Sequence, residues 1–154
     1  MLKVDHLKIY EHYKLLRVVD TSNILIKSKL NDKEKIQLAK SVRVWAYINS
    51  LILNIAKDLS MDISDKENLS KASILIHMSI FEYDQDKSIE LYYDMKKQLK
   101  IGVWKEIFVE MAEEASIDYN NIRNKKRDHP FSLLPRFDHY IKNFIDTCNK
   151  SKKT

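Results

Sequence analysis

The chain has 154 residues, of which 44% are hydrophobic and 32% are charged, a balance that excludes a disordered or membrane-embedded protein. The formal net charge is +5, which permits an anionic partner but does not require one. The single glycine, Gly102, and the two prolines exclude glycine-rich phosphate loops and disfavour hairpin-rich β folds, so the composition predicts an all-α protein.

The cysteine content and the hydropathy pattern predict a location. With Cys148 as the only cysteine, we expect no internal disulfide and a reducing compartment. Residues 1–6 lack the apolar core of a signal peptide. The most apolar stretch, residues 44–56, falls short of the roughly 20 residues that span a bilayer. We therefore expect a soluble cytoplasmic protein without a membrane partner.

In the first part of the chain, apolar spacing predicts a helix over about 4–19, which polar residues 20–23 would stop. The apolar piece 24–26 is interpreted as a bent turn. The run 31–34 has the form of a capping box and predicts the start of the longest helix, ending near residue 59. Apolar residues cover several of its faces, which is typical of the buried centre of a bundle.

In the second part, a capping-box pattern at 64–67 predicts a helix to about residue 81, and Asp84 or Asp86 caps the next one, with Gly102 as its stop. A helix over 104–115 has one apolar face and one acidic face, the latter made by Glu106, Glu110, Glu113 and Glu114. Periodicity is lost from 116 to 135, and a last helix covers about 136–149. We thus predict a single-domain bundle (1–149) of five to six helices around a central helix at about 32–59, with a frayed basic tail at 150–154.

Several kinds of chemistry lack support in this sequence. No histidine stands with a carboxylate and a second histidine at metal-ligand spacing, so we expect no metal and no cofactor. Cys148 lies on the apolar stripe of the last helix and is interpreted as packing. His77 lies within an apolar run and is interpreted as a hydrogen-bonded core histidine, and Trp45 and Trp104 occupy core positions.

One segment concentrates positive charge between the last two predicted helices. It reads Asn121-Ile122-Arg123-Asn124-Lys125-Lys126-Arg127-Asp128-His129-Pro130. Connecting segments often carry function. An arginine and a histidine separated by five residues, with an asparagine directly after the arginine, make Arg123 and His129 candidate catalytic residues.

This arrangement resembles the signature of HEPN domains, in which an arginine and a polar residue, often Asn, precede a histidine near the start of the last core helix. HEPN domains are all-α, commonly dimeric, and many are metal-independent ribonucleases of toxin and defence systems. The resemblance implies that Arg123 binds the scissile phosphate and that His129 transfers a proton at the 2′-hydroxyl. Asn124, Lys125, Lys126 and Arg127 would then contact nucleic acid, the basic ones through the phosphate backbone.

A shorter stretch, residues 51–81, resembles the middle of the flagellar-regulator family FlaF through Asp58-Leu59 and Lys71-Ala72-Ser73-Ile74-Leu75. The Leu-Trp pair of that family is replaced by Leu51-Ile52, and its Asn-x-Leu-Pro turn is missing. The likeness therefore rests on shared apolar spacing.

Three functions remain open at this level. The first, which we favour, is a helical interaction or adaptor module without catalytic activity that docks a protein or an anionic partner. The second is a HEPN-like ribonuclease that uses Arg123 and His129, and the third is RNA binding without cleavage. A homodimer is compatible with each of them.

Overall fold

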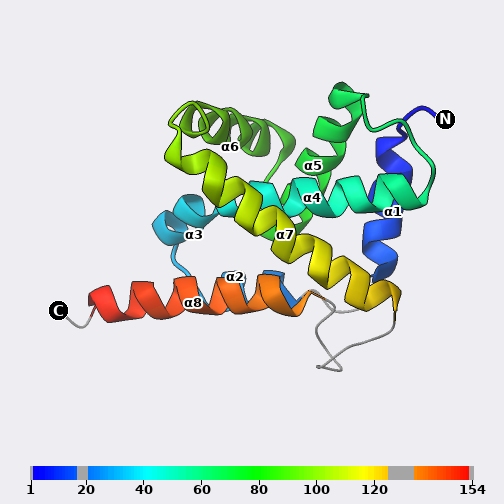
Figure 1. The fold of residues 1–154 in the computed structure, drawn as a ribbon. Helices are drawn as coiled ribbons and strands as arrows, with labels where there is room; N and C mark the ends of the chain where they lie inside the picture. Colours follow the sequence, from blue (N-terminus) through cyan, green and yellow to red (C-terminus); the bar gives the residue numbers. More distant parts are fainter. Residues whose placement is uncertain (1, 17–20, 125–133, 153–154) are drawn as a thin grey trace.

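The computed structural model describes residues 2–16, 21–124 and 134–152 (Figure 1). This part of the chain forms eight α-helices and no β-strand, which confirms the all-α prediction. Their bounds are α1 His6–Leu16, α2 Thr21–Lys29, α3 Asp32–Ala39, α4 Val42–Asp58, α5 Lys66–Phe81, α6 Gln85–Gln98, α7 Val103–Arg123 and α8 Pro135–Lys152. No helix within these ranges combines the length and the apolar character needed to cross a membrane.

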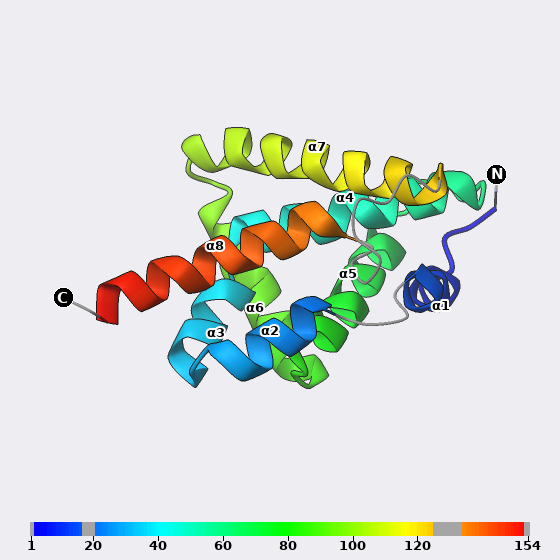
Figure 2. The ribbon, with the colours of Figure 1, turned by 90° about the horizontal axis from the view of Figure 1, so that it is seen from below.

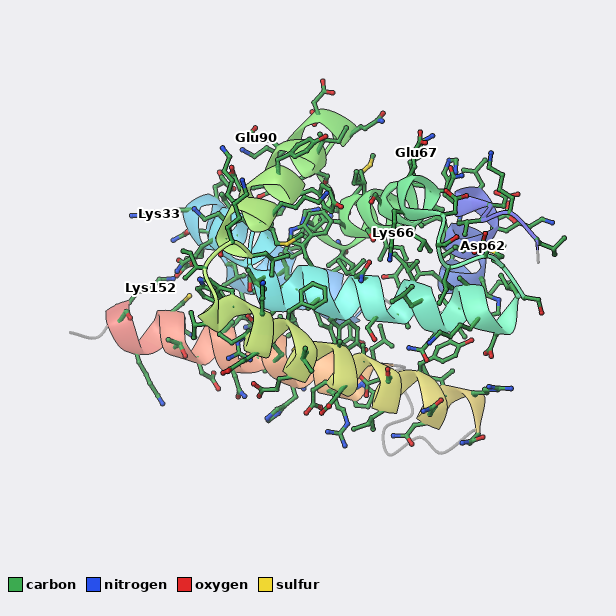
Figure 3. The ribbon with its side chains drawn as sticks, turned by 45° about the horizontal axis from the view of Figure 1, so that its top comes forward. Lys33, Asp62, Lys66, Glu67, Glu90 and Lys152 are labelled. Atoms are coloured by element: carbon green, nitrogen blue, oxygen red, sulfur yellow. The ribbon has the colours of Figure 1, made fainter. Side chains whose placement is uncertain are left out.

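Helix α4 lies at the centre of the arrangement. It packs chiefly against α7 on one side and α5 on the other. Seen from below, α7 forms the outer layer at the top of the view, with α4 beneath it, while α8 crosses in front and α1 packs against α5 (Figure 2). Charged side chains such as Lys66, Glu67 and Glu90 project from the outer faces of the bundle (Figure 3).

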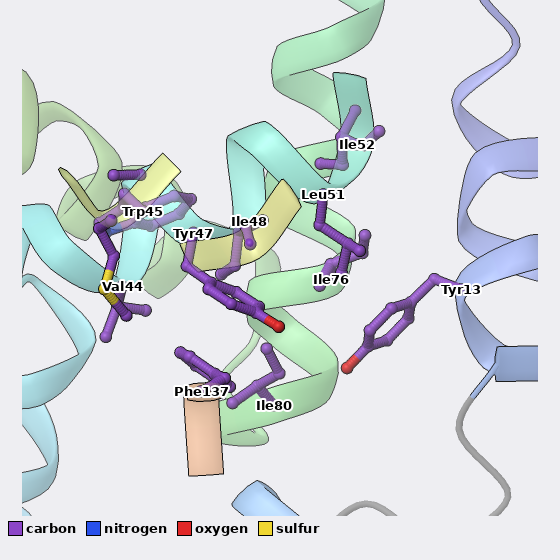
Figure 4. Close-up of a cluster of buried hydrophobic side chains, with 14 of the residues drawn as sticks. Tyr13, Val44, Trp45, Tyr47, Ile48, Leu51, Ile52, Ile76, Ile80 and Phe137 are labelled. Atoms are coloured by element: carbon purple, nitrogen blue, oxygen red, sulfur yellow. The ribbon is translucent and has the colours of Figure 1, made fainter. Parts of the chain in front are cut away.

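The core is built largely from α4, because most of its side chains are buried. Most of the polar side chains of α4 lie along one stripe that faces α7, where Ser50 and Asn54 form hydrogen bonds with that helix, and apolar residues cover most of the remaining surface. Figure 4 shows Tyr47 of α4 beside Phe137 of α8 and Ile80 of α5, and the two aromatic rings stack with centroids 4.5 Å apart. The bundle thus closes α8 onto α4 through aromatic packing.

The prediction of one long helix over 32–59 is wrong, because the chain breaks between α3 and α4. The Ser41 side chain accepts a hydrogen bond from the backbone N–H of Arg43 at 3.2 Å and caps α4. The capping box of Asn31 and Glu34, in contrast, starts α3 as predicted. The five or six expected helices become eight in the described ranges partly through this break.

His77 of α5 contacts both sides of the break from inside the core, at Ala39 of α3 and at Trp45 of α4. Its Nε2 donates to the Ala39 carbonyl at 2.8 Å, because a carbonyl oxygen can only accept, and its Nδ1 then accepts from the Ser88 hydroxyl at 3.0 Å. The imidazole also stacks on Trp45 with ring centroids 4.1 Å apart. Burial lowers the pKa of His77 to about 4, against the opposing effect of the Ala39 carbonyl. The interpretation of His77 as a core histidine is confirmed.

Residues 21–29 form helix α2, so the expected stop and bent turn are corrected. Ser22 donates a buried 2.5 Å hydrogen bond to Asp138 of α8, and the Asn23 side-chain amide donates to the Ile80 carbonyl at 2.9 Å. These side chains form hydrogen bonds with α8 and α5, which are distant in the sequence. The prediction assumed instead that they would form hydrogen bonds with the neighbouring backbone and so end the helix.

Three further predictions are corrected in the second half of the chain. Helix α7 continues to Arg123, although the predicted helix ended at Ala115. Helix α8 continues to Lys152, so most of the expected frayed tail is helical. Gly102 does not stop the preceding helix but is the N-cap residue of α7.

Candidate functional site on helix α7

Helix α7 presents three faces, and each of them carries residues that the sequence singles out. One face packs on α4, where the Ser50 hydroxyl donates to the Ala112 carbonyl at 2.8 Å. A second face lies against α8, where Asp118 is buried. The third face points away from the bundle, and no other described element covers it (Figure 2).

The C-terminal end of α7 carries Arg123, which lies in the last turn of the helix rather than in an irregular connector. Its guanidinium forms an ion pair with Asp58 of α4 at 3.1 Å. The Tyr119 hydroxyl donates to the other oxygen of the same carboxylate, and burial, with Asp58 nearby, raises the pKa of Tyr119 above its ordinary range. Asp58 therefore ties the end of α4 to the end of α7, and Arg123 takes part in this link.

Of the remaining predicted site residues, Asn124 is the C-cap of α7, and its backbone N–H donates to the Asn120 carbonyl at 2.9 Å. Lys125, Lys126, Arg127 and His129 lie outside the described residues. The pairing of Arg123 with His129 thus stays a prediction.

Asp118 joins the α8 face of α7 to the start of α8. Its carboxylate accepts from the Tyr47 hydroxyl at 2.7 Å and from the backbone N–H groups of Arg136 and Phe137 at 3.2 and 3.3 Å. These two backbone N–H groups are among those in the first turn of α8 that have no partner within the helix. Burial raises the pKa of Asp118, and the same hydrogen bonds act in the opposite direction. Asp118 is thus a capping group supplied by another helix.

A groove of about 430 Å³ runs between α7 and α8. It is polar, but its charges are largely paired. Glu114 pairs with Arg136 at 2.7 Å, and Glu110 lies 3.9 Å from Arg43. Arg123 is not among the lining residues of this groove. Half of the predicted acidic face is therefore neutralised by arginines of the same chain.

The outward face of α7 combines exposed apolar groups with carboxylates. Val109 is 58% exposed and Ile117 is 39% exposed. Both line a shallow groove of about 510 Å³ at the boundary between this face and α4, which also includes Phe108, Ala112 and Ser50. Glu106 and Glu113 are exposed on α7 and form no ion pair within the described ranges. We refer to Glu106, Phe108, Val109, Glu113 and Ile117 as the outer α7 face.

Sequence reasoning missed the apolar part of this face, because it described the outer side of the helix by its glutamates alone and ended the helix at Ala115, before Ile117. Val109 was the detectable signal, since it comes three residues after Glu106 and four before Glu113 and is therefore a neighbour of both on the surface of a helix. An apolar side chain in the middle of a polar face is unexpected for a helix that only faces water.

Comparisons with family models, curated proteins and solved structures gave no match for this chain. Within the described ranges, no group of three or more His, Cys, Asp and Glu side chains is arranged to hold a metal ion. Cys148 is half-buried, and burial together with the adjacent Glu34 raises the pKa of its thiol.

Proposed function

We propose that the protein is a helical interaction module that docks a partner helix on the outer α7 face. The observation that carries this proposal is the shallow apolar groove at Val109 and Ile117, flanked by carboxylates without a cationic partner in the described chain. The partner would present an amphipathic helix with an apolar stripe and lysine or arginine beside it.

The spacing of the apolar residues suits a helix laid along α7. Val109 and Ile117 are eight residues apart, which corresponds to about 12 Å along the helix axis. A partner helix covers such a distance with apolar residues at i, i+4 and i+7. Covering the exposed parts of the two side chains would contribute about 1 kcal/mol each.

Charge defines which helices fit. Residues 106–118 hold five carboxylates and no lysine or arginine. Glu110 and Glu114 have arginine partners within the chain, so Glu106 and Glu113 are the ones available to a partner. Lysine or arginine at the edge of the partner helix would speed its association with these carboxylates. An acidic helix would be repelled, because like charges would face each other across the interface.

Charge reversal tests this proposal. The tagged wild type, the E106K/E113K variant and a matched E67K/E90K variant would be used to capture partners from native lysate. Glu67 and Glu90 pair only with lysines of their own helices, so the control has the same change of net charge at sites of little structural importance. We expect one protein at stoichiometric amounts with the wild type and the control, and its loss with E106K/E113K. Equal recovery with all three, or recovery of nucleic acid alone, would contradict the proposal.

A metal-independent ribonuclease is the second candidate, and it rests on the likeness of Arg123 and His129 to the HEPN signature. The observation that favours it is the accessibility of Arg123, whose side chain stays 64% exposed beside Asp58. We rank it second because the structure describes every residue of the outer α7 face, whereas His129 lies outside the described residues.

A further inference from the structure

We propose that a second surface, formed by α3 and the end of α6, binds the phosphate backbone of a nucleic acid. The lysines of this surface are Lys33 on α3, Lys40 directly after that helix, Lys97 in the last turn of α6 and Lys100 two residues after α6. We call these four residues with Gln37 the α3 surface. None of them belongs to the outer α7 face, so the inference is independent of the proposed function.

The centre of the α3 surface is a groove of about 570 Å³ lined by Lys33, Ile36, Gln37 and Lys40, without a carboxylate among its lining residues. Lys33, Gln37 and Lys40 are exposed. The two lysines are seven residues apart, which places them about 10 Å apart along the axis on one side of α3. Such a pair can contact successive phosphates, and the amide of Gln37 between them can donate to phosphate oxygens.

The end of α6 extends this groove. The Gln98 side-chain amide donates to the Lys40 carbonyl at 3.4 Å, which brings the last turn of α6 against the end of α3. Lys97 and Lys100, on either side of Gln98, are exposed. Figures 1 and 2 place α3, the end of α6 and the end of α8 on the same side of the molecule.

A second groove, of about 350 Å³, shares Lys33 and Gln37 and continues toward the end of α8. Its other lining residues include the hydrogen-bonding side chains of Asn31, Thr147, Ser151 and Lys152, the Glu34 carboxylate that Lys152 pairs with, and the apolar Phe144. Lys33 and Lys152 lie on the same side of the bundle in Figure 3. Hydrogen-bonding side chains therefore extend from α3 to the end of α8.

The charge of the α3 surface is not neutralised inside the protein. Neighbouring lysines have partners, since Lys35 lies over the Tyr83 ring at 4.6 Å, Lys96 lies over the Tyr92 ring at 4.8 Å and Lys152 pairs with Glu34 at 3.2 Å. The four lysines of the α3 surface form no ion pair within the described ranges. The carboxylates of α3, Asp32 and Glu34, both lie in its first turn, beside Lys33 and away from Lys40, and Glu34 pairs with Lys152.

A nucleic acid fits this chemistry better than an anionic membrane does. Proteins that dock on membranes through lysines usually insert apolar side chains beside them. The α3 surface offers the amide of Gln37, and the adjoining groove offers the hydroxyls of Thr147 and Ser151. Leu15, at 80% the most exposed of the large apolar residues in the described ranges, lies on α1. Four backbone contacts predict that the logarithm of affinity falls with the logarithm of salt concentration with a slope of about −3 for single strands, and slightly steeper for duplex DNA.

Fluorescence anisotropy tests the inference on the full chain. The probes are end-labelled single-stranded RNA, single-stranded DNA and duplex DNA, and vesicles of phosphatidylcholine with phosphatidylserine test the membrane alternative by flotation. The variants are K33E/K40E, K97E/K100E and the matched control K8E/K66E, whose lysines are exposed on α1 and α5. Circular dichroism confirms that each variant is folded.

We expect the wild type to bind at least one of the nucleic acids with the stated salt slope. Affinity should fall about tenfold or more in K33E/K40E and in K97E/K100E, and less than threefold in the control. The three probes show which nucleic acid is preferred. Absence of binding at low salt, an equal loss in the control, or binding to vesicles alone would overturn the inference.

Discussion

His77 gives the stability of this protein a defined dependence on pH. An accessible histidine has a pKa of about 6.5, whereas burial lowers the pKa of His77 to about 4. Above pH 6.5 the imidazole is neutral in both the folded and the unfolded chain, so its full contribution to stability is present. As pH falls from about 6.5 to 4, the unfolded chain takes up a proton that the folded chain does not, and stability is lost.

The magnitude follows from the size of the pKa difference. Each pKa unit corresponds to about 1.4 kcal/mol, so the difference of about 2.5 units removes roughly 3 kcal/mol of unfolding free energy across this range. The structural cause is burial, because a protonated imidazole would carry a charge inside the core, with Nδ1 no longer able to accept from Ser88.

The assay is urea unfolding at about pH 7 and pH 4.5, followed by tryptophan fluorescence, for the wild type and for H77Q. Glutamine can still donate to the Ala39 carbonyl but does not titrate. The other titrating groups are the same in both proteins. The difference between their losses of unfolding free energy from about pH 7 to about pH 4.5 therefore reports the contribution of His77. We expect the wild type to lose roughly 2–3 kcal/mol more than H77Q between the two pH values. Equal losses, or an NMR titration of His77 near pH 6.5, would refute the reasoning.

Further predictions concern α7. D118A leaves the Tyr47 hydroxyl and the first N–H groups of α8 without their acceptor and should lower the unfolding free energy by about 2–3 kcal/mol in urea titrations; a loss below about 0.5 kcal/mol would contradict the capping role. G102A should raise stability by about 0.5 kcal/mol, because Gly102 has a negative φ and nothing lies within 4 Å of an added Cβ; a lower thermal midpoint would contradict this. If the ribonuclease candidate is correct, RNA incubated with the protein in EDTA is cleaved and R123A abolishes cleavage, while an R123A variant that cleaves equally would exclude a role for Arg123.

The sequence predicted those elements whose start carries a local signal. Capping residues located the beginnings of α3 and α6, and the near absence of glycine predicted the fold class. The central place of α4 also followed from its apolar residues, since a helix that is apolar on several faces has to be covered on more than one side. The central helix was nevertheless predicted too long, because the break at Ser41 depends on its side chain and on the distant His77.

The end of α7 could not be predicted from local pattern alone. Asp118 interrupts the apolar stripe after Ala115 and is buried only because its partners come from α4 and α8. The spacing of Met111, Ala115 and Tyr119 nevertheless continues the helical period, and that signal was available. The pairing of Arg123 with Asp58 likewise joins residues 65 positions apart, and such contacts leave no trace in a single sequence.

Site-specific photo-crosslinking tests the central claim most directly. A photoreactive phenylalanine analogue is placed at Val109 in one protein and at Leu15, the more exposed apolar position on α1, in another. If the outer α7 face is the docking site, the Val109 position crosslinks to one partner, on a peptide that carries lysine or arginine beside an apolar helical stripe, and the Leu15 position does not. Crosslinking of the same partner from Leu15 alone, or on an acidic peptide, would contradict the account.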